Sequence, residues 1–196
     1  MSIGITGGMG CGKSTAARMV AAADFRLIDA DAMIREQVLT TADVVAAVRA
    51  KWDDAVLGEN GKIDRRALAE RVFGQPEELA WLESLTHPRL FDLWRADIAD
   101  KTDQRRVFEV PLLFEKQLEN WFDFTVCVAC SPSQQLARLE QRGMPRALAE
   151  QRISQQLPLA TKLELSDIVL WNDGSTDFLQ AQVDRMLAAM VPGCAA

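Results

Sequence analysis

The sequence predicts an α/β fold in which a parallel β-sheet is flanked by helices. Short, apolar, β-prone runs recur along the chain, and segments with apolar residues at helical spacing lie between them. The first run, residues 2–6, leads through a glycine-rich loop, residues 7–15, into the first helical segment, residues 13–23. Strands that alternate with helices in this way pair in parallel, because each crossover returns the chain to the same end of the sheet.

The glycine-rich loop reads GGMGCGKST and satisfies the pattern G-x-x-x-x-G-K-[ST] between a strand and a helix. Its glycines lack Cβ atoms, so successive main-chain N–H groups can turn inward on a polyphosphate, and the following helix adds its positive N-terminal end. Lys13 supplies a cation for the β and γ phosphates, and the Ser14 hydroxyl suits one coordination position on Mg²⁺. These features predict a P-loop NTPase three-layer fold.

Five strands and the helices between them can be assigned in order. The predicted strands are residues 2–6, 25–31, 107–110, 124–129 and 168–171. The predicted helices after the first are residues 30–39, 41–52 and 65–73, a helix opened by Pro76, another opened by His87-Pro88, and residues 133–142, 145–156 and 178–190. Proline favours the first turn of a helix, where its missing N–H costs no hydrogen bond, so both prolines predict helix starts.

The chain is expected to form a single domain, residues 1–196, with its core at 1–40, 105–135 and 160–196. The helical block at about 60–104 is too long for a simple crossover, which predicts an inserted acceptor lobe. At about 138–158, Arg142, Arg146 and Arg152 surround a break in a second helical segment. This composition is expected of a mobile lid whose arginines approach transferred phosphate, and a solvated helical hairpin fits it equally well.

Composition and charge exclude several classes of protein. The chain has 48% hydrophobic and 26% charged residues, and no apolar run approaches the ~18 residues of a membrane span. A net charge of −6 argues against a sequence-independent nucleic-acid binder, which needs a basic face to displace counterions. No secretion signal is visible, so we expect a cytoplasmic location. We expect a monomer or a weak homo-oligomer, because no pattern of association can be recognised.

Cys127 and Cys130 form a C-V-A-C pair that could suggest a zinc or redox site. The pair lies at the end of an apolar run, where residues three apart point to opposite faces of a strand. Neither a second pair nor a nearby histidine completes a site. The sequence therefore predicts buried thiols.

Two carboxylates, Asp29 and Asp31, end the second predicted strand, at the end of the sheet where α/β proteins bind ligands. Asp29 can face the γ-phosphate or cap the helix that starts at residue 30, and both interpretations stay open. For Asp31 we favour a functional role, as a base or as a water-mediated metal contact. His87, the only histidine, can by itself be a satisfied residue at a helix start.

Several strings in the sequence coincide with one known family. They are TGGMGCGKST at residues 6–15, DADAMIR at 29–35, RRALAERVF at 65–73, THP at 86–88, VPLLFE at 110–115 and SDIVLWNDG at 166–174. Together they closely resemble the dephospho-CoA kinases over nearly the whole chain, and the later strings are more specific than the glycine loop. The resemblance implies a transferase of coenzyme A biosynthesis that moves the γ-phosphoryl group of ATP, with Mg²⁺, to the ribose 3′-hydroxyl of dephospho-CoA.

The resemblance also implies roles for individual residues. Asp31 matches the carboxylate that acts as base toward the hydroxyl, and Lys13 and Arg142 match the other catalytic groups. The implied nucleotide contacts are Gly8, Gly10, Cys11, Gly12, Lys13, Ser14, Thr15, Arg142 and Asn172, with Ser14 also as metal ligand. The implied acceptor contacts are Thr6, Asp31, Arg35, His87, Leu112 and Glu115, which reverses the structural interpretation of His87.

Three positions depart from the family pattern, which usually has Ser where Cys11 stands, often an acidic residue where Gly143 stands, and Asp where Trp171 stands. None of the three removes a catalytic group. Trp171 alters the residues expected to contact the adenine of ATP. Cys11 places a thiol in the phosphate loop, and we expect this thiol to be sensitive to oxidation.

Two other functions fit the glycine loop when it is taken alone. Another small-metabolite or nucleoside monophosphate kinase would share the loop and the lid but lack the HP and PLLFE strings. A nucleotide-dependent switch specific for guanine would normally show N-K-x-D, which is absent. A motor ATPase would show a longer apolar strand that ends in its metal carboxylate.

Overall fold

The structure, a computed structural model, describes residues 1–72, 74–100 and 104–190. The chain divides into two compact units, Met1–Ile28 with Thr102–Ala196 and, between them in sequence, Asp29–Lys101. We call the first the sheet unit and the second the helical unit. No helix in the described ranges is both long and apolar enough to cross a membrane.

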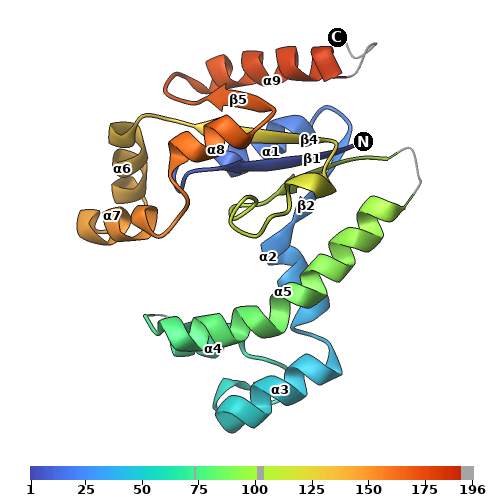
Figure 1. The fold of residues 1–196 in the computed structure, drawn as a ribbon. Helices are drawn as coiled ribbons and strands as arrows, with labels where there is room; N and C mark the ends of the chain where they lie inside the picture. Colours follow the sequence, from blue (N-terminus) through green and yellow to red (C-terminus); the bar gives the residue numbers. More distant parts are fainter. Residues whose placement is uncertain (73, 101–103, 191–196) are drawn as a thin grey trace. The chain divides into compact units, whose positions relative to one another are not determined.

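The sheet unit is built on five strands in the order β2-β3-β1-β4-β5, which confirms the predicted three-layer α/β fold (Figure 1). The strands are β1 (Ser2–Gly7), β2 (Phe25–Asp29), β3 (Arg105–Glu109), β4 (Phe124–Ala129) and β5 (Ile168–Trp171). β1 pairs in parallel with β3 and β4, and β4 pairs in parallel with β5. This register brings together the carboxyl ends of the central strands, where the phosphate loop begins.

The two faces of β1 meet different layers, because side chains alternate along a strand. Ile3 and Ile5 are fully buried in the main core, which they share with residues of α1 and α9. Gly4 lies on the opposite face, where an added Cβ would stand 2.6 Å from the Phe122 ring, so the loop after β3 packs closely there. The helices of this unit are α1 (Lys13–Ala21), α6 (Pro132–Gln141), α7 (Arg146–Ser154), α8 (Leu159–Leu165) and α9 (Thr176–Met190), with a 3₁₀ turn at Glu119–Trp121.

The helical unit has a core of its own. Val44 and Val48 are fully buried beside Leu68, and the rings of Trp52 and Trp81 meet edge-on with centroids 4.8 Å apart. Such an aromatic pair adds to the apolar burial that holds short helices together. Its elements are α2 (Ala30–Met33), a π-helical turn (Ile34–Val38), α3 (Ala42–Trp52), a 3₁₀ turn (Asp53–Val56), α4 (Arg65–Val72) and α5 (Pro76–Ala99).

The predicted helix break at His87-Pro88 is wrong, because α5 continues through Pro88 from Pro76 to Ala99. Leu90 and Trp94, beyond the proline, are buried, so tertiary packing overrides the local preference for a new helix start. The helical unit also begins at Asp29, earlier than the predicted lobe at about 60–104, because the segment after β2 contributes to the core of that unit. The short helix α8 was not predicted.

Candidate functional site

The phosphate loop joins β1 to α1 and contains three glycines with backbone angles that other residues rarely adopt, Gly7, Gly10 and Gly12. Gly7 has φ of +140°, and a Cβ there would lie 2.0 Å from the Val128 carbonyl oxygen. Gly12 has φ of +101° and is the N-cap of α1, whose first turn carries no acidic residue. No carboxylate in the first turn of α1 therefore offsets the positive N-terminal end of the helix. This end can attract an anion.

Lys13 lies folded into the loop. It is 8% exposed, and its Nζ donates to the carbonyl oxygens of Gly7 at 3.3 Å and Gly8 at 3.0 Å. Burial lowers the pKa of Lys13 below its ordinary value, against the opposing influence of Cys11 and Glu109. A phosphate oxygen offers a stronger partner than two carbonyl groups, so this ammonium is suited to binding a nucleotide phosphate.

Ser14 meets a carboxylate that the sequence analysis did not assign. Its Oγ donates to Oε1 of Glu109, the last residue of β3, at 2.8 Å. A hydroxyl and a carboxylate side by side supply the hard oxygen atoms that Mg²⁺ prefers, so the residues present fit this ion. The available signal was an acidic residue at the carboxyl end of a predicted strand, the position where α/β sheets bind ligands.

Cys11 of the loop is buried. Cys127 and Cys130, the C-V-A-C pair, are buried too, as predicted. Cys130 donates to the Sγ of Cys11 at 3.4 Å. This hydrogen bond lowers the pKa of Cys11 to about 7 although burial opposes it, and it raises the pKa of Cys130. Burial raises the pKa of Cys127 to about 11. No group of three or more metal-ligating side chains occurs in the part of the chain that the structure describes.

The turn after β5 is fastened to the phosphate loop. Asn172 is 8% exposed, and its Nδ2 donates to the Cys11 carbonyl oxygen at 2.8 Å. The guanidinium of Arg138 donates to the carbonyl oxygens of Asn172 at 2.7 Å and Cys11 at 3.4 Å. Arg138 was missed by the sequence analysis, because nothing distinguishes it there from a surface arginine of an amphipathic helix.

Two pockets open beside the loop, and Arg142 lines both. The first, about 200 Å³, is on the Asn172 side. The second, about 270 Å³, contains Lys13, Ser14 and Glu109. The structure thus brings Gly10, Gly12, Thr15, Arg142 and Asn172 together around one pocket, and Lys13 and Ser14 around its neighbour. Trp171, a departure from the family pattern, is 46% exposed at the end of β5.

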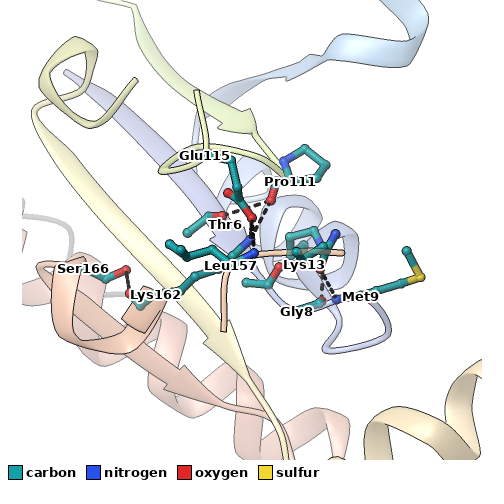
Figure 2. A network of polar contacts seen from close by, with 11 residues as sticks. Thr6, Gly8, Met9, Lys13, Pro111, Glu115, Leu157, Lys162 and Ser166 are labelled. Carbon is teal, nitrogen blue, oxygen red and sulfur yellow. Dashed lines mark hydrogen bonds and ion pairs between the residues drawn. The ribbon is translucent and has the colours of Figure 1, made fainter. Parts of the chain in front are cut away.

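A polar network lies under the loop that follows β3 (Figure 2). Glu115 Oε1 accepts from Lys162 Nζ at 2.7 Å and from the Leu157 main-chain N–H at 3.0 Å. The Pro111 carbonyl oxygen accepts from Lys162 Nζ at 3.0 Å and from Thr6 Oγ1 at 3.4 Å. Figure 2 shows Glu115 and Pro111 converging on the same ammonium. Lys162 was not singled out from the sequence, because a lone lysine in a short helix resembles a surface residue.

The segment predicted to be a lid, residues 138–158, also contacts the phosphate loop directly. The main-chain N–H of Met9 donates to Oε1 of Gln156, two residues beyond α7, at 3.2 Å. Two adjacent residues thus make different contacts: Gln156 contacts the phosphate loop, and Leu157 contacts Glu115. Leu112 is half-buried in the same loop after β3.

A separate pocket of about 310 Å³ lies wholly within the helical unit. Its polar lining consists of Asp31, Arg35 and Arg65, and its apolar lining comes mainly from α4 and the π-helical turn. A carboxylate, two guanidinium groups and an apolar wall suit an acceptor that carries both phosphate and a hydrocarbon or ring portion. Arg65 was missed as a site residue, although it opens the RRALAERVF string.

The two remaining predictions at the helical unit have different outcomes. Asp29 caps α2, because its Oδ1 accepts from the Ala32 main-chain N–H at 3.0 Å, which settles the capping question in favour of this role. His87 lies within α5, half-buried, with its ring centroid 5.8 Å from that of Phe91. It is not among the residues that line the pocket of Asp31 and Arg35.

Known proteins resemble this chain over nearly its whole length. The sequence profile of the family described as Dephospho-CoA kinase matches residues 1–177. Dephospho-CoA kinase of Thermosynechococcus vestitus is 37% identical over 195 residues, which cover 98% of this chain and 96% of that protein. Dephospho-CoA kinase of Bdellovibrio bacteriovorus is 36% identical over 188 residues, which cover 94% of each.

Solved structures show the same fold. TT1252 from Thermus thermophilus superposes with a TM-score of 0.76 at 32% identity, covering 97% of this chain and 98% of that one. Shikimate kinase from Bacteroides thetaiotaomicron, at a TM-score of 0.55 and 17% identity over 97% of this chain and 98% of that one, shares the fold alone. With a family match that takes in both the phosphate loop and the pocket of Asp31, Arg35 and Arg65, the chain belongs to the dephospho-CoA kinase family.

Proposed function

We propose that this protein is a dephospho-CoA kinase that transfers the γ-phosphoryl group of ATP to the ribose 3′-hydroxyl of dephospho-CoA, giving coenzyme A and ADP. The observation that carries the proposal is the family match over residues 1–177, which includes the phosphate loop and every polar residue of the acceptor pocket. The expected cytoplasmic location and monomeric or weakly associating state stay predictions from the sequence.

In this mechanism the sheet unit binds the donor. The main-chain N–H groups of the phosphate loop and the N-terminus of α1 hold the phosphates, and Lys13 moves from its carbonyl partners to a phosphate oxygen. Ser14 and Glu109 would hold Mg²⁺, directly or through its water ligands, and this ion would neutralise charge on the phosphates. Arg142, which lines both pockets, stabilises negative charge on the transferred group.

The helical unit binds the acceptor. Arg35 and Arg65 offer bidentate partners for its phosphate groups, and Asp31 orients the attacking hydroxyl and takes its proton as the new P–O bond forms. The structural placement of His87 in α5, outside this pocket lining, leaves its acceptor contact as an expectation of the family resemblance alone. Positioning and charge stabilisation account for most of the catalysis in such a transfer.

The proposal is tested by measuring ADP production from MgATP by the purified protein with dephospho-CoA, with AMP, and without an acceptor. Mass spectrometry identifies each product. We expect a gain of one phosphate on dephospho-CoA alone. Phosphate on AMP would indicate a nucleoside monophosphate kinase, and ADP without any acceptor would indicate a nucleotide-dependent switch or motor; either result would overturn the proposal.

A further inference from the structure

Lys162 is a fully buried cation that the mechanism above does not use. Its side chain is 0% exposed in α8, and Thr6, Pro111 and Glu115 lie around it at the carboxyl end of β1 (Figure 2). A buried ammonium is costly unless every part of its environment compensates it, so an apolar residue would serve a purely structural helix better. The position of this charge therefore calls for an explanation beyond packing.

The hydrogen bonds around Lys162 involve residues of three segments, and two of these residues, Pro111 and Glu115, contact the ammonium itself. Pro111 and Glu115 bound the loop after β3, which is expected to contact the acceptor. Leu157, which donates to the same Glu115 oxygen, follows the lid helix α7. Ser166 Oγ donates to the Lys162 carbonyl oxygen at 2.7 Å and fixes the end of α8 just before β5. The Lys162 ammonium thus contacts the loop after β3 directly, and Glu115 extends this connection to Leu157, beyond α7.

The two oxygens of the Glu115 carboxylate have different environments. Oε1 accepts from Lys162 and Leu157, whereas Oε2 is buried and has no hydrogen-bond partner in the described part of the chain. A buried acceptor without a donor is unfavourable, so Oε2 is suited to receive an O–H or N–H group of a bound molecule. Because Lys162 holds Oε1, it determines which oxygen is left for that donor.

We propose that Lys162 is a positioning residue for phosphoryl transfer: it fixes the Pro111–Glu115 loop to the end of the lid and presents Glu115 Oε2 to an O–H or N–H donor of the acceptor. The proposal rests on the dephospho-CoA kinase function for the identity of that acceptor. The proximity of a second cation is consistent with Lys162 lowering the pKa of Lys13, an influence smaller than that of burial.

The test compares wild type with Lys162→Met, Lys162→Arg and the double variant Lys162→Met/Glu115→Gln. Lys116→Met is the matched control, because Lys116 is exposed, adjoins Glu115 in sequence and loses the same charge. Steady-state kinetics are measured well below each variant's unfolding temperature, with MgATP and dephospho-CoA varied separately. For Lys162→Met we expect kcat to fall at least about tenfold and the KM for dephospho-CoA to rise about tenfold, whereas the KM for ATP stays within about twofold.

Two variants separate positioning from folding. The double variant has no uncompensated buried charge, so its thermal stability should be higher than that of Lys162→Met while its kcat stays low. Lys162→Arg keeps the positive charge, so it should retain most of the wild-type stability and most of the wild-type kcat. Wild-type kinetics in Lys162→Met, or a loss of kcat that returns together with stability in the double variant, would overturn the proposal.

Hydrogen exchange tests the tether without any substrate. In Lys162→Met, but not in Lys116→Met, the Leu157 amide should lose at least about tenfold of its protection, because the carboxylate that accepts from it is released. Unchanged protection would contradict the tether even if wild type proved inactive toward dephospho-CoA. That inactivity, by contrast, would reject the proposed function and with it the assignment of the acceptor to Oε2.

Discussion

At the scale of single residues, the neighbouring carboxylates Asp29 and Asp31 have different structural environments. Asp29 caps α2, and Asp31 lines the pocket of the helical unit where we propose that the acceptor binds. We expect Asp31→Asn to lower kcat at least about 100-fold with little change in ATP affinity, because a general base typically contributes that much to a proton transfer. Steady-state kinetics and calorimetric ATP binding measure the two effects.

The control for Asp31→Asn is Asp29→Asn, because asparagine caps a helix as well as aspartate does and removes the same charge. This variant should retain kcat within about threefold. A near-normal turnover in Asp31→Asn would remove Asp31 from the role of base.

Glu109 allows a second prediction at this scale. Glu109→Gln keeps an oxygen that can accept from Ser14 but loses the negative charge. If Glu109 supports Mg²⁺, the concentration of Mg²⁺ that gives half-maximal activity should rise at least about tenfold. Glu140→Gln, on the exposed side of α6, should leave that concentration unchanged. An unaltered Mg²⁺ dependence in Glu109→Gln would contradict the assignment.

The Cys11 thiol predicts an unusual pH dependence. Because its pKa is lowered to about 7, the folded protein holds a thiolate above that pH, and the rate of reaction with a small methanethiosulfonate should level off by about pH 8. Cys130→Ala removes the hydrogen-bond donor and should shift the midpoint upward. The reaction is followed by mass spectrometry of the peptide that contains Cys11.

MgATP should slow this reaction, because Cys11 is fully buried and a bound nucleotide suppresses the opening that exposes it. Cys127, whose pKa is raised to about 11, is the internal comparison and should react much more slowly. A rate that MgATP leaves unchanged would count against the coupling between this thiol and the nucleotide site.

At the scale of secondary-structure elements, α5 continues through an internal proline and buries Leu90 and Trp94 beyond it. Pro88 has no N–H to donate to the carbonyl four residues earlier, and its ring crowds that turn. We expect Pro88→Ala to increase the free energy of unfolding by about 1–2 kcal/mol, less than the full cost of an interior proline because alanine also loosens the unfolded chain. Urea unfolding with an unchanged m-value is the measurement.

Pro76→Ala provides the contrast, since Pro76 opens α5 where a missing N–H costs nothing. The Pro76→Ala substitution should therefore not increase the free energy of unfolding. A loss of stability in Pro88→Ala would show that the ring of Pro88 is needed for packing within the helical unit.

The elements also show what the sequence could and could not reveal. The strands and the phosphate loop were predictable, because short apolar β-prone runs and glycine spacing are local signals. Pro88 misled the prediction, because packing of Leu90 and Trp94 outweighs a local preference. Pattern alone did not single out Glu109, Arg138 and Lys162, since their contacts join segments far apart in the sequence.

At the scale of the whole molecule, the two pockets beside the phosphate loop lie within the sheet unit, and the pocket of Asp31 and Arg65 lies within the helical unit. We therefore expect separate hydrogen-exchange footprints: MgATP should protect amides of the phosphate loop and α1, and dephospho-CoA should protect amides near Asp31 and Arg65. At a ligand concentration 100 times Kd, amides that exchange only from the ligand-free state should slow by up to about 100-fold.

Mass spectrometry of peptides from each unit makes this measurement. AMP serves as the control for the acceptor, since it lacks the pantetheine portion of dephospho-CoA and should give a weaker footprint. Protection of the helical unit by MgATP equal to that by dephospho-CoA would contradict separate binding regions.

The bond from Asn172 to the Cys11 carbonyl joins residues 161 positions apart in the chain. During translation the ribosome makes the phosphate loop long before Asn172, the residue that fastens it. A nascent chain of about 150 residues would thus carry the whole glycine-rich string and still lack the contact that holds it. We expect nucleotide affinity to appear only when the last strand has left the exit tunnel, so cellular ATP would stabilise finished molecules rather than growing ones.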